Sequence, residues 1–300
     1  MRIGTRRSAL ALAQAELVAE LLGGADIVPF LTRGDRGAAQ EDKSRWVAEL
    51  EDALLEGEID LAVHSAKDLP GELAKGLALL GSPARAATED VLCGVSSLDE
   101  LAPGARIGTS SIRRMAQLRA EREDLEVVSL RGNVDTRLRK LAEGEDDLEA
   151  IVLARAGLQR LGRDSELGGV LDPTRFVPAP GQGALALEGR AQDPSVAAAL
   201  QAITDSAAFT CLLSERAVAH ELGASCHTPF GANASLADDD ALRLRVWLGL
   251  PDGSAWASDE LLGAASAPAE LGREVALRLR SAGAGDLLRR AEEMAGVGSR

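Results

Sequence analysis

Hydroxyl, amide and guanidinium side chains gather where three apolar strand patterns give way to helix patterns. Such groups bind carboxylates and phosphates, and the free N–H groups of a helix start add to them. In a chain of net charge −14, this concentration predicts a polyanionic ligand. The alternative is that Ser and Asn only cap the helices while the arginines lie on the surface. The segments are Thr5-Arg6-Arg7-Ser8, Thr109-Ser110-Ser111 with Arg113-Arg114, and Arg131-Gly132-Asn133.

An acidic residue follows a further apolar strand. Asp68 comes after the end of this strand and directly before Leu69-Pro70. It is either a turn residue or a catalytic carboxylate. Lys67 is expected to point the other way along extended chain, so the two side chains need not pair.

The three cysteines are odd in number and widely spaced, which excludes a disulfide framework. Cys93 is expected in a strand and Cys211 in a helix, both as buried, inert thiols. Cys226 follows small residues on a loop and is the best candidate for covalent chemistry. His64, His220 and His227 have no zinc-site spacing with Cys226, so we expect no metal.

Alternating strand and helix patterns predict α/β domains for most of the chain, and segregated strands and helices predict a small α+β domain at its end. The expected strands are 2–5, 27–31, 59–63, 106–109, 126–130, 150–154, 184–188, 232–236, 242–250 and 254–258. The expected helices are 8–23, 46–55, 110–121, 134–142, 157–161, 196–222 with a break near Asp205, and 270–294.

Two linker patterns, at 82–88 and 178–183, suggest that the chain crosses twice between two domains. Arg-Ile-Gly-Thr occurs at 2–5 and again at 106–109, each time before a Ser-rich helix start with paired arginines, which favours two similar domains. We predict domain 1 at 1–83 and 184–202, domain 2 at 89–178 and domain 3 at 205–300.

Composition excludes several classes of function. The chain has 33 basic and 47 acidic side chains and 2% aromatic residues, which argues against a nucleic-acid binder. Gln14, Glu16 and Glu20 interrupt the first apolar stretch, so no signal peptide or membrane span is expected and we predict a cytoplasmic protein. No phosphate loop or dinucleotide-binding glycine motif is present.

At this point the motifs resemble the porphobilinogen deaminase (hydroxymethylbilane synthase) family. The matching stretches run in family order over most of the chain: RIGTRRSALAL (2–12), TRGD (32–35), DLAVHSAKDLP (60–70), GTSSIRRMAQL (108–118), SLRGNVDTRL (129–138), IVLARAGLQRLG (151–162) and PGQGA (180–184). The segment 36–46 differs, because it is shorter and more acidic than the family's usual lid.

The resemblance implies two doubly wound domains like those of periplasmic binding proteins, plus the C-terminal α+β domain. It implies a dipyrromethane primer joined to Cys226 through a thioether, and porphobilinogen as the substrate of a monomeric enzyme without a nucleic-acid or membrane partner. Porphobilinogen units lose ammonia and add one at a time, and water releases hydroxymethylbilane after four additions. Asp68 falls at the catalytic position. The candidate binding residues are Arg6, Ser8, Ser65, Lys67, Thr109, Ser110, Ser111, Arg113, Arg114, Arg131, Gly132, Asn133, Arg137, Arg160 and Gln182.

Two other readings predict different features. A two-domain anion- or solute-binding module would share the cleft and the helix starts, but it would need neither Asp68 nor a thiol on the third domain. A metal- or thiol-dependent hydrolase would need a histidine partner, and the sequence offers no such arrangement.

Overall fold

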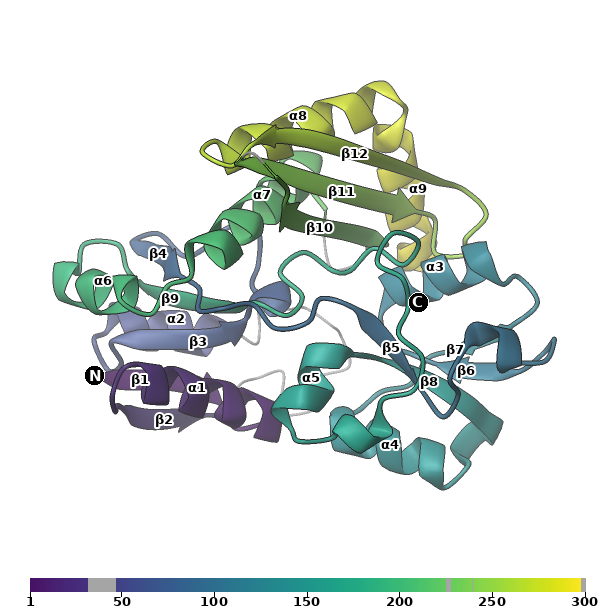
Figure 1. Ribbon diagram of the computed structural model, residues 1–300, viewed down its shortest axis with the longest axis horizontal. Coiled ribbons are helices and arrows are strands. Elements are labelled where there is room, and N and C mark those ends of the chain that lie inside the picture. The colour runs from purple at the N-terminus through teal and green to yellow at the C-terminus, as the bar shows by residue number, and fades with distance from the viewer. Residues whose placement is uncertain (32–46, 225–227, 239, 298–300) are drawn as a thin grey trace.

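A computed structural model describes residues 1–31, 47–224, 228–238 and 240–297, whose strands form three sheets (Figure 1). The first sheet has the order β2-β1-β3-β9-β4, with β1 parallel to β2 and β3, and β9 antiparallel to β3 and β4. Its strands are β1 (Arg2–Arg6), β2 (Asp26–Phe30), β3 (Leu61–Ser65), β4 (Leu77–Gly81) and β9 (Leu185–Arg190). Residues 185–190 thus return to the sheet that residues 2–81 begin.

Helices cover both faces of this sheet. α1 (Ala9–Leu21) and α6 (Pro194–Gln201) pack on one face through apolar side chains such as Val18 and Leu200. α2 (Ala48–Leu55) packs on the other face, where Leu50 and Leu54 meet Ile59. Burial of these apolar surfaces holds the strands, and therefore the residues at their ends, in fixed positions.

The second sheet repeats this arrangement with the order β5-β8-β6-β7. Its strands are β5 (Asp90–Cys93), β6 (Arg106–Gly108), β7 (Glu126–Val128) and β8 (Leu148–Ala154). α3 (Ile112–Glu121) covers one face through Leu118, while α4 (Val134–Ala142) and α5 (Arg155–Arg160) cover the other through Leu138 and Leu158.

The third sheet is antiparallel, in the order β10-β11-β12, and its own helices α7 to α9 cover one of its faces (Figure 1). Its strands are β10 (Phe230–Leu236), β11 (Ala241–Gly249) and β12 (Trp256–Ala264), and its helices are α7 (Ser206–Leu222), α8 (Pro268–Ser281) and α9 (Ala284–Val297). On the opposite face, Trp247 packs against Ala116 of α3 and Val177. The mixed α/β fold with a small α+β part matches the predicted fold class.

Most expected elements are confirmed to within a few residues, but four expectations were wrong. The last helix is two helices, because Gly283 turns the chain with φ +97° between them. The strand expected at 254–258 is β12, which begins after a turn closed from Gly253 N to Leu250 O. β4 was not expected at all. Lys67 and Asp68 lie in a 3-10 turn, Ala66–Asp68, rather than in extended chain.

No single helix in the described ranges is long and apolar enough to cross a membrane. α6 and α7 pass that test only when taken together, and they meet at an angle of 117°.

A buried carboxylate joins the third domain to both predicted linkers. The carboxylate of Glu215 in α7 accepts hydrogen bonds from the two terminal nitrogens of Arg85, at 2.7 and 3.0 Å. It also accepts the backbone N–H groups of Gly181 and Ala234, each at 2.6 Å. Arg85 in turn donates to the carbonyl oxygen of Gln182 at 2.9 Å.

Replacing Glu215 by alanine is expected to lower the free energy of unfolding by about 3–5 kcal/mol, because it leaves a buried guanidinium and two N–H groups without acceptors. The measurement is urea denaturation. Glu293→Ala is the control, since Glu293 pairs with Arg289 on the surface at 2.6 Å and should change stability by less than about 1 kcal/mol. Equal losses in the two variants would contradict the role of Glu215.

Candidate functional site

Three of the predicted helix starts have the expected caps. Ser8 accepts from Ala11 N at 3.3 Å, Ser111 from Arg114 N at 3.5 Å and Asn133 from Thr136 N at 2.8 Å. These side chains therefore serve the helix ends, as the alternative interpretation predicted. Each cap uses only an acceptor oxygen, so the donor hydrogens of these side chains can still meet an anion.

A narrow cavity brings together three predicted site residues that lie far apart in the sequence. Ser65 at the end of β3, Lys67 in the following turn and Arg160 of α5 line it, together with Gln14 of α1. Arg160 donates to the carbonyl oxygen of Gly183 at 2.6 Å, and burial lowers the pKa of its guanidinium to about 10. The end of β3 in the first sheet, helix α5 of the second sheet and glycines of the second predicted linker thus meet around this cavity.

Gln14 is a residue that the sequence analysis missed. It is buried on α1, and its side-chain amide donates to the Ser65 hydroxyl at 2.8 Å. A polar residue beside Ala15 and Val18 on the buried face of a helix was the available signal.

Lys67 and Asp68 sit side by side in the turn that follows β3. Burial lowers the pKa of the Lys67 ammonium to about 8; the Arg114 and Arg113 charges also lower it, while Asp68 and Asp90 oppose the shift. Asp68 is partly buried, and its carboxylate makes no hydrogen bond or ion pair within the described ranges. The turn therefore presents a cation and a carboxylate beside the arginines of the second domain.

Arg113 and Arg114 are almost fully buried, at 4% and 6% exposure, and both are held by Asp90. Arg113 pairs with Asp90 Oδ2 at 2.8 Å, and Arg114 donates to Oδ1 at 2.7 and 3.0 Å. Gln182 is buried as well and donates to Asp90 Oδ1 at 2.7 Å. Burial alone would raise the pKa of the Asp90 carboxyl, but the two guanidiniums and these hydrogen bonds hold it well below its usual range.

The start of α4 carries a second group of candidates. Gly132 has φ +124°, and a Cβ there would lie 2.7 Å from Thr136 Cγ2, so the turn requires glycine. Its carbonyl oxygen accepts from Arg137 Nε at 2.7 Å, while Arg131 is exposed.

The remaining candidates lie at the ends of β1 and β6. Arg6 is partly buried at the end of β1. Thr109 is fully buried and accepts from Ser111 N at 3.3 Å, so it holds the turn before α3, whereas Ser110 is partly buried.

Of the three cysteines, Cys226 lies outside the described residues, as does His227. Cys93 and Cys211 are free and buried, as expected. Burial raises the pKa of the Cys93 thiol to about 11 and also raises that of Cys211. No group of three His, Cys, Asp or Glu side chains in the described part of the chain could hold a metal ion.

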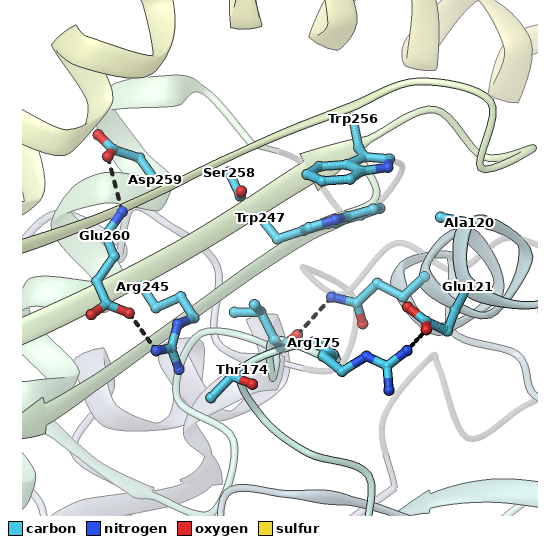
Figure 2. A pocket seen from close by; sticks show the side chains of 12 residues that line it. Ala120, Glu121, Thr174, Arg175, Arg245, Trp247, Trp256, Ser258, Asp259 and Glu260 are labelled. Atoms are coloured by element: carbon cyan, nitrogen blue, oxygen red, sulfur yellow. Dashed lines mark hydrogen bonds and ion pairs between the residues drawn. The ribbon is translucent and has the colours of Figure 1, made fainter. Parts of the chain in front are cut away.

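A wider groove of about 430 Å³ lies elsewhere, between α3 and the face of the third sheet opposite α7 to α9. Figure 2 shows Trp256 lying over Trp247, with Arg245 bonded to Glu260 and Arg175 bonded to Glu121. None of the predicted site residues lines it. The groove is therefore separate from the cavity around Lys67.

Comparison with known proteins gives two family matches. Residues 1–198 match "Porphobilinogen deaminase, dipyromethane cofactor binding domain", and residues 209–281 match "Porphobilinogen deaminase, C-terminal domain". A porphobilinogen deaminase of Thermus thermophilus is 44% identical over 294 residues, covering 95% of this chain and 97% of its own. One from Brevibacillus brevis is 40% identical over 300 residues, covering 96% of each chain.

Solved structures also match part of the chain. The methionine-binding protein MetQ covers 68% of it, and 89% of MetQ is matched, with a TM-score of 0.43 and 14% identity. Immunogenic lipoprotein A from Vibrio vulnificus also covers 68%, and 94% of that protein is matched, with a TM-score of 0.40 and 14% identity.

Proposed function

The chain belongs to the porphobilinogen deaminase family, and we propose that it joins four porphobilinogen molecules head to tail and releases hydroxymethylbilane. In each condensation the aminomethyl C–N bond breaks and ammonia leaves. A C–C bond forms to a pyrrole α-carbon, which loses its proton. The enzyme is thus a transferase of porphyrin biosynthesis with a dipyrromethane cofactor.

The residues present fit this cofactor, whose pyrroles carry acetate and propionate groups. Lys67 and Arg160 line one cavity, and the Arg113 and Arg114 charges lie close enough to shift the pKa of Lys67. The buried Nε of Arg113 has no hydrogen-bond partner among the residues that the structure describes, and it can donate to a carboxylate. When bound, the cofactor supplies the pyrrole α-carbon to which the first substrate is joined.

Asp68 is the residue that we assign to the chemistry. Loss of ammonia leaves an electron-poor substrate, and its attack by a pyrrole develops positive charge on ring N–H groups. The Asp68 carboxylate, which has no hydrogen-bond or ion-pair partner in the described part of the chain, can accept these N–H groups, stabilise the charge and assist the proton transfer. The observation that carries the proposal is this carboxylate beside Lys67, with buried arginines on the second domain.

Ammonia release distinguishes this function from that of an anion-binding module. We expect the purified protein to release one ammonia for each porphobilinogen consumed and to form hydroxymethylbilane. Binding of porphobilinogen without ammonia release would favour the module instead.

The pH dependence of substrate uptake should follow Lys67. Its ammonium is charged below a pKa of about 8, so KM for porphobilinogen should be lowest there and rise as the pH passes from about 8 to 10. Lys67→Arg should keep a charged group and remove most of this rise, because guanidiniums stay protonated. The measurement is the pH profile of kcat/KM; an unchanged profile in the variant would contradict this role.

The free energy of unfolding should rise with pH over a similar range, although substrate binding weakens there. Lysine in the unfolded chain has the usual pKa of 10.5, so between about 8 and 10.5 the unfolded state binds more protons than the folded state. Lys67 therefore adds to the free energy of unfolding as the pH rises through this window.

We also propose that Cys226 carries the cofactor and that the enzyme is a cytoplasmic monomer without nucleic-acid or membrane partners. The burial of Cys93 and Cys211 supports Cys226 as the attachment point, and the net charge of −14 argues against binding to nucleic acid. Sedimentation equilibrium and cell fractionation test the monomer and the compartment.

A further inference from the structure

We propose that Asp90 is a positioning residue: its carboxylate fixes Arg113 and Arg114 in the orientation that receives substrate carboxylates and ties both arginines to a linker between the domains. This inference rests on the proposed function, because it concerns binding at the same site.

Asp90 is placed to hold two guanidiniums with one carboxylate. It is 1% exposed and begins β5, directly after the first linker. Arg113 and Arg114 are consecutive residues at the start of α3, and each meets a different carboxylate oxygen. Each guanidinium is also fixed at a second point, because Arg113 donates to Val177 O at 2.8 Å and Arg114 to Val152 O at 3.0 Å.

Gln182 adds a third contact, from the second linker. Its amide nitrogen donates to Asp90 Oδ1 and to Thr88 O, both at 2.7 Å. Because both partners are acceptors, only the nitrogen can face them, which fixes the orientation of the amide. Both arginines and Gln182 of the second linker therefore meet at this carboxylate, and Gln182 also joins it to Thr88 of the first linker, so a shift of either linker would disturb the binding groups.

Charge and geometry predict opposite effects of removing this carboxylate. If Asp90 acted only through its charge, its loss would leave the site more positive and an anionic substrate would bind more tightly. If Asp90 positions the arginines, its loss frees two buried guanidiniums to turn and the substrate binds more weakly, despite the extra positive charge.

The experiment compares the wild-type holoenzyme with Asp90→Asn, which keeps the size of the side chain. We expect KM for porphobilinogen to rise roughly tenfold or more, the scale of a lost hydrogen bond to a charged group, while kcat per primed molecule stays near the wild-type value. Intact mass gives the primed fraction. A fall in KM would overturn the proposal, and so would an unchanged KM with a lower kcat, which indicates a merely structural role.

Asp259→Asn is the matched control, since Asp259 holds Arg278 at 2.7 and 3.0 Å on the third domain and should leave KM unchanged. If Asp90→Asn does not fold, Gln182→Met decides, because it removes the amide's hydrogen bonds to Asp90 and Thr88 O and keeps the contacts between Asp90 and both arginines. A raised KM with wild-type kcat supports the proposal, and an unchanged KM overturns it. A wild-type protein that neither carries primer nor consumes porphobilinogen would instead overturn the proposed function.

Discussion

Replacing Asp68 by alanine is expected to lower kcat about a thousandfold while the protein keeps its primer. A carboxylate about 4 Å from a developing cation contributes roughly 4 kcal/mol at an effective dielectric constant near 20. If that interaction is made only in the transition state, its loss corresponds to roughly three powers of ten in rate. The measurement is single-turnover consumption of porphobilinogen by protein whose primed fraction is known.

Two controls separate the charge of Asp68 from its effect on the fold. Asp68→Asn should lose most of the same activity, because it keeps the shape of the side chain and removes the charge. Asp60→Ala should be nearly as active as the wild type, since Asp60 pairs at 2.7 Å with Arg2 at the start of β1, the end of the strand opposite Arg6. Turnover near the wild-type rate in Asp68→Ala would refute the catalytic assignment.

Cys226→Ser is expected to give a folded protein without primer and without measurable product formation. A thioether forms from a thiolate, and a serine hydroxyl is a far weaker nucleophile at neutral pH. Loss of the attachment point removes the pyrrole to which the first substrate is joined. The measurements are the intact mass of the variant and its rate of hydroxymethylbilane formation.

Cys93→Ser and Cys211→Ser serve as matched controls and should both keep the primer. Both thiols are buried, and burial raises the pKa of Cys93 to about 11, so neither forms a thiolate readily. Stability should fall in both, because a hydroxyl replaces an apolar thiol in the core. If the primer persists in Cys226→Ser and disappears in one of the two controls, the attachment point is the cysteine replaced in that control and not Cys226.

Local sequence patterns predicted the helix starts well. Ser111 and Asn133 cap α3 and α4 as expected, since a cap depends on residues only three positions apart. The break before α7 at Asp205 was predicted for the same reason. The resemblance to a family then predicted that these helix starts face the ligand, and this stays a prediction.

Contacts between distant residues could not be predicted in this way. Arg113 and Arg114 were expected as ligand-binding residues, but Asp90, which holds them, lies 23 and 24 positions away, respectively. Gln182, which also contacts Asp90, lies 92 positions from it in the sequence. The buried pair of His64 and Glu188, 2.9 Å apart, spans 124 positions. Only the folded sheets bring such groups together, so a local sequence pattern cannot predict these contacts.

The intact mass of the purified protein, followed by tryptic mapping, shows whether the protein carries a covalent primer and on which thiol. The three cysteines fall in separate tryptic peptides, 86–106, 191–216 and 217–243, so the map identifies the modified thiol. We expect an excess of two porphobilinogen units, less one ammonia for each, on peptide 217–243, which contains Cys226. An unmodified mass that stays unchanged after incubation with porphobilinogen would contradict this expectation.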